Sequence, residues 1–416
     1  MAQKADKATA VWVVRRLRAA GYQALLAGGC VRDMLLGVRP DDYDVATNAE
    51  PPQVHKLFRR SLMVGAKFGV VVVLHRDRRH VDRMIEVATF RRDSTYTDGR
   101  RPDAVRFSSP QEDAARRDFT INGMFFDPIS EELIDYVGGQ ADLQTGVVRT
   151  IGDPNKRFAE DYLRLLRAVR FASRLAFRLH PAAANALDAH AGKITQISGE
   201  RIYDELTKMF SHPSSVAALD AMKKHHLLQH ILPELFEPND EAYLAARQRV
   251  GRLPCPDDEL LNFGALLMDL PEGVLGRIAR RWGASNQRKE ALQWFHRRRD
   301  AWRQAAETPL CEFKRLMARE EWPWLRVLWK VREKIETNSQ QQALRIARRA
   351  GGVATEQVAP SPFITGDDLI SLGLPPGRDM GQMLRALYDE QLNETLTTRR
   401  DALAEARKRL ADNNNA

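Results

Sequence analysis

The chain has 416 residues, 44% hydrophobic and 29% charged, a composition typical of a folded protein of two or three domains. Lys and Arg number 64 against 55 Asp and Glu, and the resulting net charge of +9 favours a polyanionic partner without requiring one. No run of about 18 apolar residues predicts a membrane span, and no secretion signal is recognisable. Three widely spaced cysteines argue against a disulfide framework or a zinc site, so a reducing cytoplasm is the expected location.

Strand and helix patterns alternate in the first 150 residues. Residues 25–27 are predicted as a strand that leads through two glycines into a helix at 31–36. The β-branched run at 70–74 and the alternating segment 82–89 are predicted as two further strands. An α+β head with a mixed sheet and helices is therefore expected over residues 1–150.

The remainder of the chain is predicted to be all helical. From about Pro154 onward, Ala, Leu, Arg and Glu dominate, with apolar residues at three- and four-residue spacing. A stretch rich in Gly, Ala and Pro at 351–362 is expected to link the last helical part to the rest.

The first chemical motif is Gly28-Gly29 at the predicted strand-to-helix turn. Adjacent glycines let backbone amides approach a phosphate closely, and the start of a helix adds a favourable dipole. Arg32, in the first helical turn, can add a charge-assisted hydrogen bond to the same phosphate. An ordinary tight turn would need the same glycines, so the motif alone leaves both interpretations open.

Two aspartates follow this turn. If residues 42–44 form a strand, Asp42 and Asp44 point to one face, where their repulsion is unfavourable unless a cation neutralises it. Magnesium suits such a pair, and two-metal phosphoryl transfer requires it. Glu86 is the candidate for a third catalytic carboxylate, the alternative being a solvent-facing strand residue. Asp41 would face the other way and is expected to be structural.

The segment Arg116 to Asn122 begins with two arginines next to Asp118. They are candidates to bind a triphosphate, and the alternative is a surface ion pair of little energetic weight.

Charged residues recur at every third position between Glu160 and Phe171, with large apolar residues between them. We expect a helix whose charges line a partly buried pocket, the alternative being ion pairing within the helix. A carboxylate can accept from an exocyclic amine and a guanidinium can donate to a ring nitrogen or carbonyl. Cytosine and adenine both carry that amine, so such a pocket could select C and A without a nucleic-acid template.

Together these motifs resemble those of the class II tRNA nucleotidyltransferase and bacterial poly(A) polymerase family, within the DNA polymerase β-like superfamily, over about residues 20–235. The resemblance implies a nucleotidyltransferase head (1–150), a helical neck (151–235), a helical body (236–355) and a helical tail (356–416). It implies two Mg²⁺ ions on Asp42 and Asp44 and the substrates ATP and CTP. The nucleotide contacts that it implies are Gly29, Arg32, Arg117, Asp161, Arg164, Arg167 and Arg170.

The implied reaction is nucleotide addition to the 3′ end of tRNA, with neither DNA nor a membrane as partner. The sequence 65–71 lacks the basic stretch usual in the poly(A) polymerases of this group. The loop 89–102, which enzymes that add only CC largely lack, is retained, so adenosine addition is expected, and the segment 364–369 resembles one of many CCA-adding enzymes. We therefore expect CCA addition rather than addition of the terminal A alone or poly(A) synthesis. A non-catalytic RNA-binding protein is the alternative from another class, and the presence of both aspartates together with the arginine helix weighs against it.

In the predicted body, residues 263–269 resemble the remains of an HD phosphohydrolase core. Met268 stands where a metal-binding histidine would be, and a thioether is a poor ligand for a hard metal ion. We expect Asp269 to be structural and phosphohydrolase activity to be absent.

Overall fold

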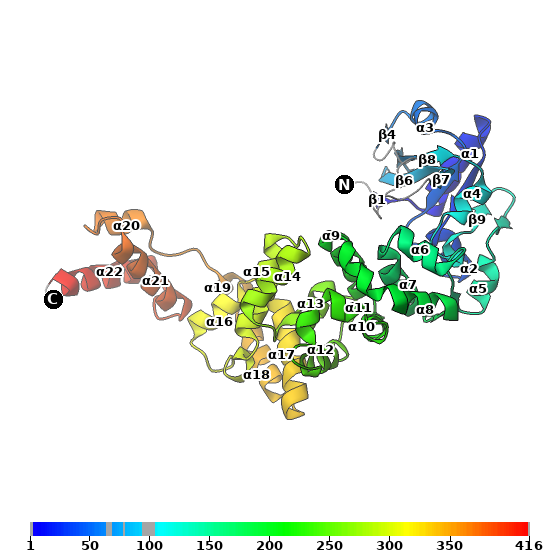
Figure 1. Cartoon of the computed structure of the whole chain (residues 1–416). Helices are drawn as coiled ribbons and strands as arrows, with labels where there is room; N and C mark the ends of the chain where they lie inside the picture. The colour runs from blue at the N-terminus through cyan, green and yellow to red at the C-terminus, as the bar shows by residue number, and fades with distance from the viewer. Residues whose placement is uncertain (1–2, 64–68, 78–79, 94–104, 415–416) are drawn as a thin grey trace. The chain divides into compact units, whose positions relative to one another are not determined.

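The protein is described by a computed structural model covering residues 3–63, 69–77, 80–93 and 105–414 (Figure 1). The chain forms two compact units, Met1–Pro233 and Glu234–Ala416. Within the described ranges every strand belongs to the first unit, while the second is built of helices (Figure 1). None of the helices formed by these residues is long and apolar enough to cross a membrane.

The first unit is organised around an eight-stranded mixed sheet with the order β10-β9-β2-β3-β6-β5-β4, in which β1 also pairs with β6. Its strands are β1 (Gln3–Lys4), β2 (Ala24–Ala27), β3 (Asp44–Thr47), β4 (Ser61–Leu62), β5 (Val70–Arg76), β6 (Asp82–Thr89), β9 (Phe125–Asp127) and β10 (Glu132–Ile134). The strands predicted at 25–27, 70–74 and 82–89 are confirmed. The strand predicted over 42–44 begins only at Asp44, so Asp42 precedes the sheet.

The sheet has one face that is fully covered and one that carries polar side chains. Alternate residues of β5 and β6, such as Val71, Val73 and Val87, are fully buried. They pack under α1 (Lys7–Ala19) and α3 (Pro51–Leu57), because a strand sends successive side chains to opposite faces. The side chains of the alternating residues between them, together with Asp44 of β3 and Glu86 of β6, point to the other face.

The rest of the head is formed by short helices and by small strands outside the main sheet. These elements are α2 (Gly29–Leu35), β7 (Arg91–Asp93), β8 (Val105–Phe107), α4 (Pro110–Ala115), η2 (Thr120–Asn122), α5 (Gly139–Gln144) and β11 (Val147–Val148), the last paired with β12 (Arg178–Leu179). The head helices α2 and α4 and the turn η2 supply polar side chains next to the face that carries Asp44.

A group of helices follows the head within the first unit (Figure 1). They are α6 (Pro154–Glu160), α7 (Leu163–Leu175), α8 (Pro181–His190), η3 (Ala191–Gln196), α9 (Gly199–Phe210), α10 (Ser215–Lys224) and α11 (Leu227–Ile231). The packing of α7 against α9 and α10 buries Leu165, Leu166 and Val169 completely. The single helix predicted over 160–171 is wrong at its start, because α6 ends at Glu160 and the chain extends at Asp161 before α7 begins.

The second unit is entirely helical in its described part. Its elements are η4 (Pro233–Leu235, which begins at the junction), α12 (Glu241–Val250), α13 (Glu259–Leu267), α14 (Glu272–Arg281), α15 (Asn286–Arg298), η5 (Ala301–Arg303), α16 (Leu310–Met317), α17 (Trp322–Thr337), α18 (Gln341–Gly351), α19 (Thr355–Val358), α20 (Gly366–Ser371), α21 (Arg378–Leu392) and α22 (Arg399–Asn414). The last three helices share a hydrophobic cluster that includes Leu369 and Leu387. The segment 364–369 has a local structural role, because Thr365 and Asp368 form the capping box of α20.

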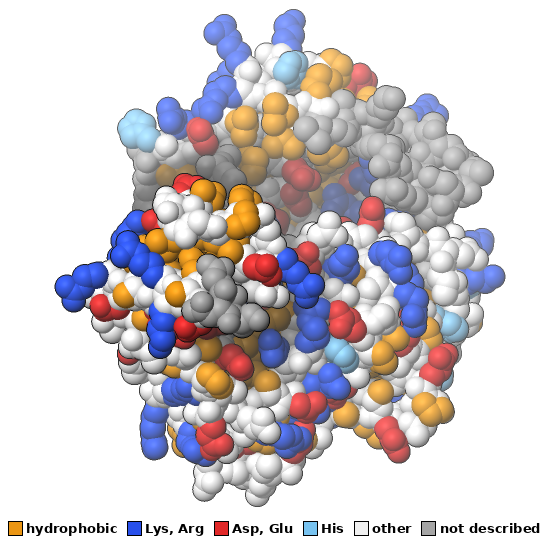
Figure 2. All heavy atoms as spheres, turned by 90° about the vertical axis from the view of Figure 1, so that its left-hand side faces the viewer, with side chains coloured by type: hydrophobic (Ala, Val, Ile, Leu, Met, Phe, Trp, Pro, Cys, Tyr) orange, Lys and Arg blue, Asp and Glu red, His pale blue; other side chains and the backbone are white. Residues whose placement is uncertain are grey.

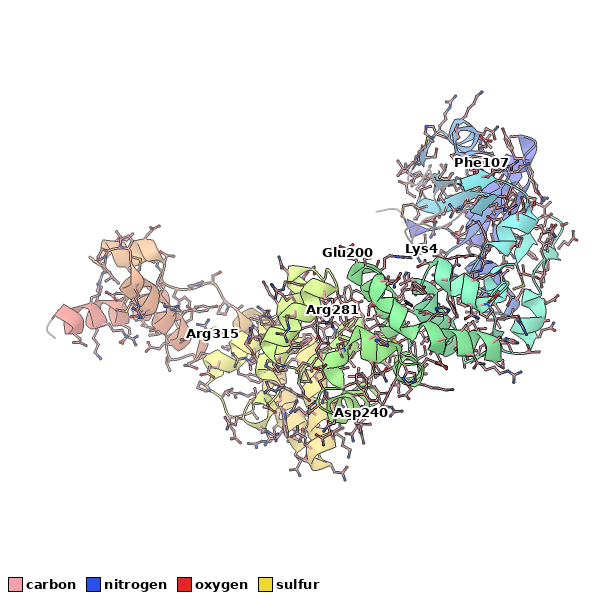
Figure 3. All side chains as sticks on the ribbon, viewed as in Figure 1. Lys4, Phe107, Glu200, Asp240, Arg281 and Arg315 are labelled. Atoms are coloured by element: carbon pink, nitrogen blue, oxygen red, sulfur yellow. The ribbon has the colours of Figure 1, made fainter. Side chains whose placement is uncertain are left out.

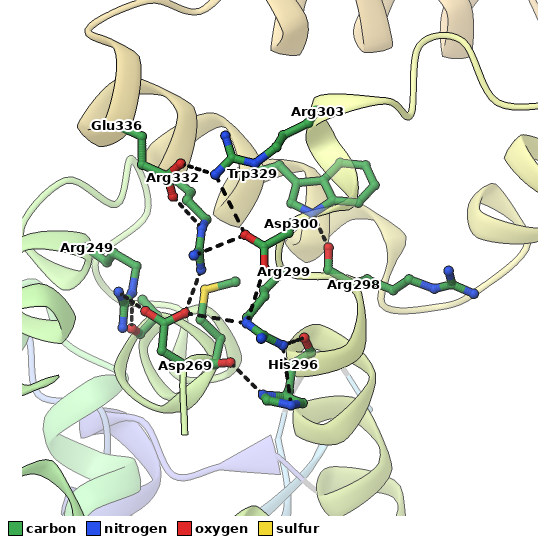
Figure 4. Close-up of polar contacts among 12 residues, drawn as sticks. Arg249, Asp269, His296, Arg298, Arg299, Asp300, Arg303, Trp329, Arg332 and Glu336 are labelled. Atoms are coloured by element: carbon green, nitrogen blue, oxygen red, sulfur yellow. Dashed lines mark hydrogen bonds and ion pairs between the residues drawn. The ribbon is translucent and has the colours of Figure 1, made fainter. Parts of the chain in front are cut away.

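Asp269 lies in a network of arginines at the surface of the second unit, and its side chain is 35% exposed (Figure 4). Its two carboxylate oxygens accept from Arg249 and, at 2.6 Å, from Arg332, while Met268 beside it is 1% exposed. Burial opposes ionisation, yet Arg249 and Arg332 outweigh it and lower the pKa of Asp269. The guanidinium groups thus neutralise this carboxylate, which supports the structural role expected for Asp269.

Replacing Asp269 by asparagine is expected to destabilise the second unit by about 2 kcal/mol, because it leaves the buried Arg249 without its carboxylate while the site is partly solvated. Urea unfolding followed by tryptophan fluorescence measures this, since six of the seven tryptophans lie beyond residue 234. The matched control is Asp300→Asn, whose side chain is 48% exposed in the same network. Equal losses in the two variants would contradict a special role for Asp269.

The surface carries charge of both signs. On the face shown in Figure 2, Lys and Arg side chains are spread widely, with Asp and Glu among them. Charges of both signs are therefore mixed on this face, and specific binding has to be argued from individual cavities.

Candidate active site

The carboxylates of Asp44 and Glu86 lie on neighbouring strands. Asp44, the first residue of β3, is directly opposite Glu86 of β6 in a parallel pair, and such strands are about 4.8 Å apart. Both side chains therefore lie on the same sheet face. Burial, together with the nearby Asp42 and Glu86 carboxylates, raises the pKa of Asp44 to about 7. The site concentrates negative charge that favours a bound cation or proton.

Asp42 joins this site from the irregular segment before β3. The burial pattern still alternates, with Tyr43 buried between the exposed Asp42 and the half-buried Asp44. One Asp42 oxygen accepts from Lys4 Nζ at 2.9 Å. Among the described residues, no three His, Cys, Asp or Glu side chains are grouped so as to hold a metal ion, and Asp42 is paired with the lysine instead.

The glycine turn supplies a backbone conformation that other residues rarely adopt. Gly28 has φ of +76°, and a Cβ there would lie 3.0 Å from Arg117 Nη1, so a side chain would meet both strain and crowding. Arg32 is 5% exposed and donates to Asp33 Oδ1 at 2.8 Å and to Asn122 Oδ1 at 2.7 Å. The turn and Arg32 are thus fixed side by side before any ligand arrives.

Arg116 and Arg117 are held by one buried carboxylate. Asp113 of α4 is 1% exposed, and its two oxygens accept from Arg116 at 2.7 Å and from Arg117 at 3.0 Å. Burial opposes the ionisation of Asp113, but Arg117 and Arg116 outweigh it and lower its pKa. The arginines are half-buried, which excludes the surface ion pair considered from the sequence. Arg116 and Arg117 follow Asp113 by three and four residues in the sequence, a spacing that could have predicted this pairing on a helix.

The arginines of α7 pair with carboxylates on three other segments. Arg164 donates to Glu160 of α6, Arg167 to Asp118 at 2.6 Å, and Arg170 to Glu205 of α9 at 2.6 Å. Ion pairing within the segment 160–171 therefore explains only the contact of Arg164 with Glu160, at i,i+4 spacing, because the partners of Arg167 and Arg170 lie outside that segment.

Asp161 belongs to the connection that positions α7. One of its carboxylate oxygens accepts from the backbone of Leu163 at 3.0 Å, and the other from Arg201 at 2.7 Å. The first bond satisfies an amide in the opening turn of α7, and the second ties that turn to α9. Asp161 is therefore fixed just before the N-terminus of α7 and is not part of the helix.

These groups surround a cavity of about 500 Å³. It is lined by Gly28, Gly29, Arg32, Asp44, Arg91, Arg116, Arg117, Asp118, Asn122, Asp161, Arg164, Arg167 and Phe171. Seven of the ten site residues expected from the sequence are on its wall, whereas Asp42, Glu86 and Arg170 are not. Asp42 and Glu86 lie beside Asp44, and the Arg170 guanidinium is bonded to Glu205 instead of lining the cavity.

Several lining residues were not singled out from the sequence. Asp118 and Asn122 were inside the segment recognised as a motif, but their partners, Arg167 and Arg32, are far away along the chain. Phe171 carries three cations around its ring, with Arg32, Arg167 and Arg170 at 5.2, 5.4 and 4.4 Å from its centroid. The local sequence contains no pattern that would predict these cation–π contacts for a phenylalanine on a helix.

Asp118 makes the stability of the first unit depend on pH. Burial opposes its ionisation, but the charge and hydrogen bond of Arg167 lower the pKa of Asp118 from 3.8 to about 2. A lowered carboxyl pKa stabilises the fold above the unfolded value, and this contribution of about 2 kcal/mol is lost as the pH falls from about 4 to 2. Thermal unfolding should thus separate wild type from Asp118→Asn at pH 6, with the gap closing towards pH 2. A gap independent of pH would contradict this pairing.

Comparisons with known proteins agree with the geometry. A sequence model described as the poly A polymerase head domain matches residues 24–149, and one described as a probable RNA and SrmB-binding site of polymerase A matches residues 176–237. Poly(A) polymerase I of Salmonella typhi is 38% identical over 252 residues, which are 58% of this chain and 53% of that protein. The match thus spans about half the length of that relative.

Two CCA-adding enzymes match more of the chain. That of Lactobacillus helveticus is 35% identical over 282 residues, 68% of each protein. The crystal structure of the Bacillus stearothermophilus CCA-adding enzyme in complex with CTP superposes with a TM-score of 0.77, at 26% identity and over 98% of both chains. The chain therefore belongs to the family of class II tRNA nucleotidyltransferases and bacterial poly(A) polymerases, whose fold it shares throughout.

Proposed function

We propose that this protein adds nucleotides to the 3′ end of tRNA without a nucleic-acid template, using CTP and ATP to build CCA. The observation that carries the proposal is that the carboxylate Asp44 lines the same cavity as the arginines of α7 and of the segment 116–117. In the reaction the acceptor 3′-oxygen forms a bond to the α-phosphorus and loses its proton, while the bond to the departing pyrophosphate breaks.

The cluster of carboxylates around Asp44 suits a magnesium ion. Mg²⁺ in such sites uses one or two protein carboxylates, with phosphate oxygens and water as the other ligands, so Asp42 and Asp44 suffice as donors. The raised pKa of Asp44 reflects its burial and the neighbouring carboxylates of Asp42 and Glu86, whose negative charge a cation would relieve. Two bound ions would supply charge neutralisation at the attacking and leaving oxygens. Glu86, exposed beside Asp44, adds a third negative charge to the group.

The arginines and glycines of the cavity would bind the triphosphate. Arg32 and Arg117 are each fixed by bonds to head residues, so little side-chain entropy is lost when a phosphate binds. The Gly28–Gly29 turn offers backbone amides at the start of α2 on the same wall.

Base choice would depend on Asp161, Arg164 and Arg167, which line the cavity at the start of α7. A carboxylate that accepts from an exocyclic amine, beside guanidiniums that donate, suits cytosine and adenine. Arg170 would act indirectly by placing α7 through Glu205, since it does not line the cavity.

Full CCA addition is proposed over A-only addition or poly(A) synthesis. This choice rested partly on the stretch 65–71 and the loop 89–102. Residues 65–68 of the stretch and residues 94–102 of the loop lie outside the described residues. Poly(A) polymerases and CCA-adding enzymes are both similar to this chain, so the number of nucleotides added has to be measured.

The test offers the purified protein Mg²⁺, a tRNA lacking its 3′ CCA, and labelled CTP or ATP separately and together. Incorporation of C, C and A supports the proposal. Use of ATP alone on tRNA ending in CC would identify an A-adding enzyme, and long A tails on unrelated RNA would identify a poly(A) polymerase. If the protein incorporates neither nucleotide, the alternative of a non-catalytic RNA-binding protein would remain.

Arg164→Gln tests the proposed base choice. It should lower discrimination against UTP and GTP by about tenfold, because it removes a donor to the base. The affinity of the protein for Mn²⁺ should not change. Selectivity equal to that of the wild type would contradict the assignment.

A further inference from the structure

Phe171 of α7 is the one aromatic side chain among the described residues that line the cavity of about 500 Å³. It is 6% exposed and packs edge-to-face on Phe119, with the ring centroids 5.7 Å apart and an angle of 75° between the rings. Because Phe119 is itself fully buried, it holds the Phe171 ring in a fixed orientation. The wall of the cavity thus contains one fixed aromatic ring among charged residues.

Three guanidinium groups surround this ring. The Cζ atoms of Arg32, Arg167 and Arg170 lie 5.2, 5.4 and 4.4 Å from its centroid. These distances are within the roughly 6 Å over which the negative face of an aromatic ring attracts a cation. Arg167 and Arg170 belong to the same helix as Phe171, whereas Arg32 belongs to α2 of the head. The ring is therefore a contact that the head shares with α7.

The carboxylates around the three arginines do not make this connection. The partners are Asp33 for Arg32, Asp118 for Arg167 and Glu205 for Arg170. No carboxylate in the described part of the chain pairs with both Arg32 and an arginine of α7.

One polar path does connect Arg32 to Arg167. Asn122 accepts from Arg32 at 2.7 Å and donates to Asp118 at 3.3 Å, and Asp118 accepts from Arg167 at 2.6 Å. The ring of Phe171 is the second path, and it is the shorter one because it contacts both guanidinium groups directly.

We propose that Phe171 is a positioning residue that couples triphosphate binding to base choice. This rests on the proposed function, in which Arg32 binds the triphosphate and Arg167 contributes to the choice of base. Because the ring contacts both guanidinium groups, a shift of Arg32 towards a phosphate changes the packing and the electrostatic repulsion around Arg167. The contacts to the phosphates and to the base are then not independent of each other.

Phe171→Leu keeps an apolar side chain and removes the π face. It should lower the preference for CTP over UTP about threefold to tenfold, because Arg32 and Arg167 lose their common neighbour. Phe171→Tyr retains the ring and should restore the wild-type preference. The affinities for CTP and for UTP are measured by isothermal titration calorimetry with Mg²⁺ and without RNA, so that no acceptor is present to be extended.

A double-mutant cycle separates this coupling from ordinary packing. Arg32→Gln in an otherwise wild-type chain should lower the preference for CTP about threefold, although Arg32 is assigned to the phosphates. In the Phe171→Leu background the same substitution should lower it no more than about 1.5-fold, because only the path through Asn122 then remains.

Phe158→Leu on α6 is the matched control for the loss of a buried ring. Phe158 is fully buried in the same unit and has no cation over its ring among the residues that the structure describes. This variant should lower the melting temperature at least as much as Phe171→Leu does, because it removes more completely buried surface. It should leave the preference for CTP over UTP at the wild-type value.

A folded Phe171→Leu protein with the wild-type preference would overturn the proposal, and so would equal effects of Arg32→Gln in the two backgrounds. A lower melting temperature with unchanged preference would show that the ring has a structural role alone. If wild type still incorporates CTP and ATP in these cases, the proposed function stands and only the coupling is wrong. If wild type incorporates neither nucleotide and binds CTP and UTP equally well, both proposals fail.

Discussion

Replacing Asp44 by asparagine is expected to lower the rate of nucleotide addition by about a thousandfold or more, because it removes charge from the proposed centre of nucleotidyl transfer. Asp44 lines the cavity of about 500 Å³ and also lies opposite Glu86 in the sheet. Single-turnover incorporation of labelled CTP measures the effect independently of product release.

This loss should not come from unfolding. Burial and the neighbouring carboxylates raise the pKa of Asp44 to about 7, so its charge is unfavourable in the folded protein. In EDTA, Asp44→Asn should therefore melt no lower than wild type, and a lower melting temperature would point to a structural role. The control Glu132→Gln removes an exposed carboxylate from β10 of the same sheet and should leave both properties unchanged. Wild-type activity in Asp44→Asn would rule out the proposed centre.

The second large effect is expected for Glu205→Gln. Glu205 is 2% exposed and accepts from Arg170 at 2.6 Å and Lys208 at 3.1 Å, with Arg167 at 3.7 Å. Breaking a buried ion pair by removing one partner costs about 3–5 kcal/mol. Burial raises the pKa of Glu205, but Arg170 and Arg167 outweigh it and hold the pKa below its usual value, so the loss applies fully at neutral pH.

Nucleotide selection should suffer along with stability. With Glu205 neutral, α7 loses the bond that fixes Arg170, and Arg167 on the cavity wall loses a neighbour. We expect kcat/KM for CTP and ATP to fall about tenfold or more, with weaker discrimination against UTP. The control is Glu200→Gln, an exposed carboxylate on the same α9 (Figure 3). Unchanged selectivity in a folded Glu205→Gln protein would mean that α7 is positioned without this residue.

The sequence revealed those parts of the site whose geometry is local. Gly28 has the positive φ that a glycine at a tight turn suggests, and 82–89 is the strand that its alternation predicts. Arg116 and Arg117 follow Asp113 at helical spacing, so their pairing was also within reach of sequence reasoning. In these cases the interacting atoms are within four residues of each other, and backbone geometry alone brings them together.

The predictions of secondary structure were wrong where the chain departs from a regular helix or strand. Asp42 was assigned to a strand that begins at Asp44, and Asp161 to a helix that begins at Leu163. Alternation and helical periodicity describe the interior of an element but not its ends, because caps and side-chain bonds decide where an element begins. At Asp161 those bonds come from the backbone of Leu163 and from Arg201, forty residues away.

By itself the sequence predicted the type of chemistry from paired aspartates, a glycine turn and an arginine-rich helix, each of which is recognisable within a short segment. Only the tertiary structure decided which groups meet. Asp44 is opposite Glu86, Arg167 meets Asp118 and Lys4 reaches Asp42 because the sheet register and the packing of α7 fix them there. Pairings between such distant residues depend on closing long loops and on burying shared apolar surface, and no local pattern of residues encodes these energies.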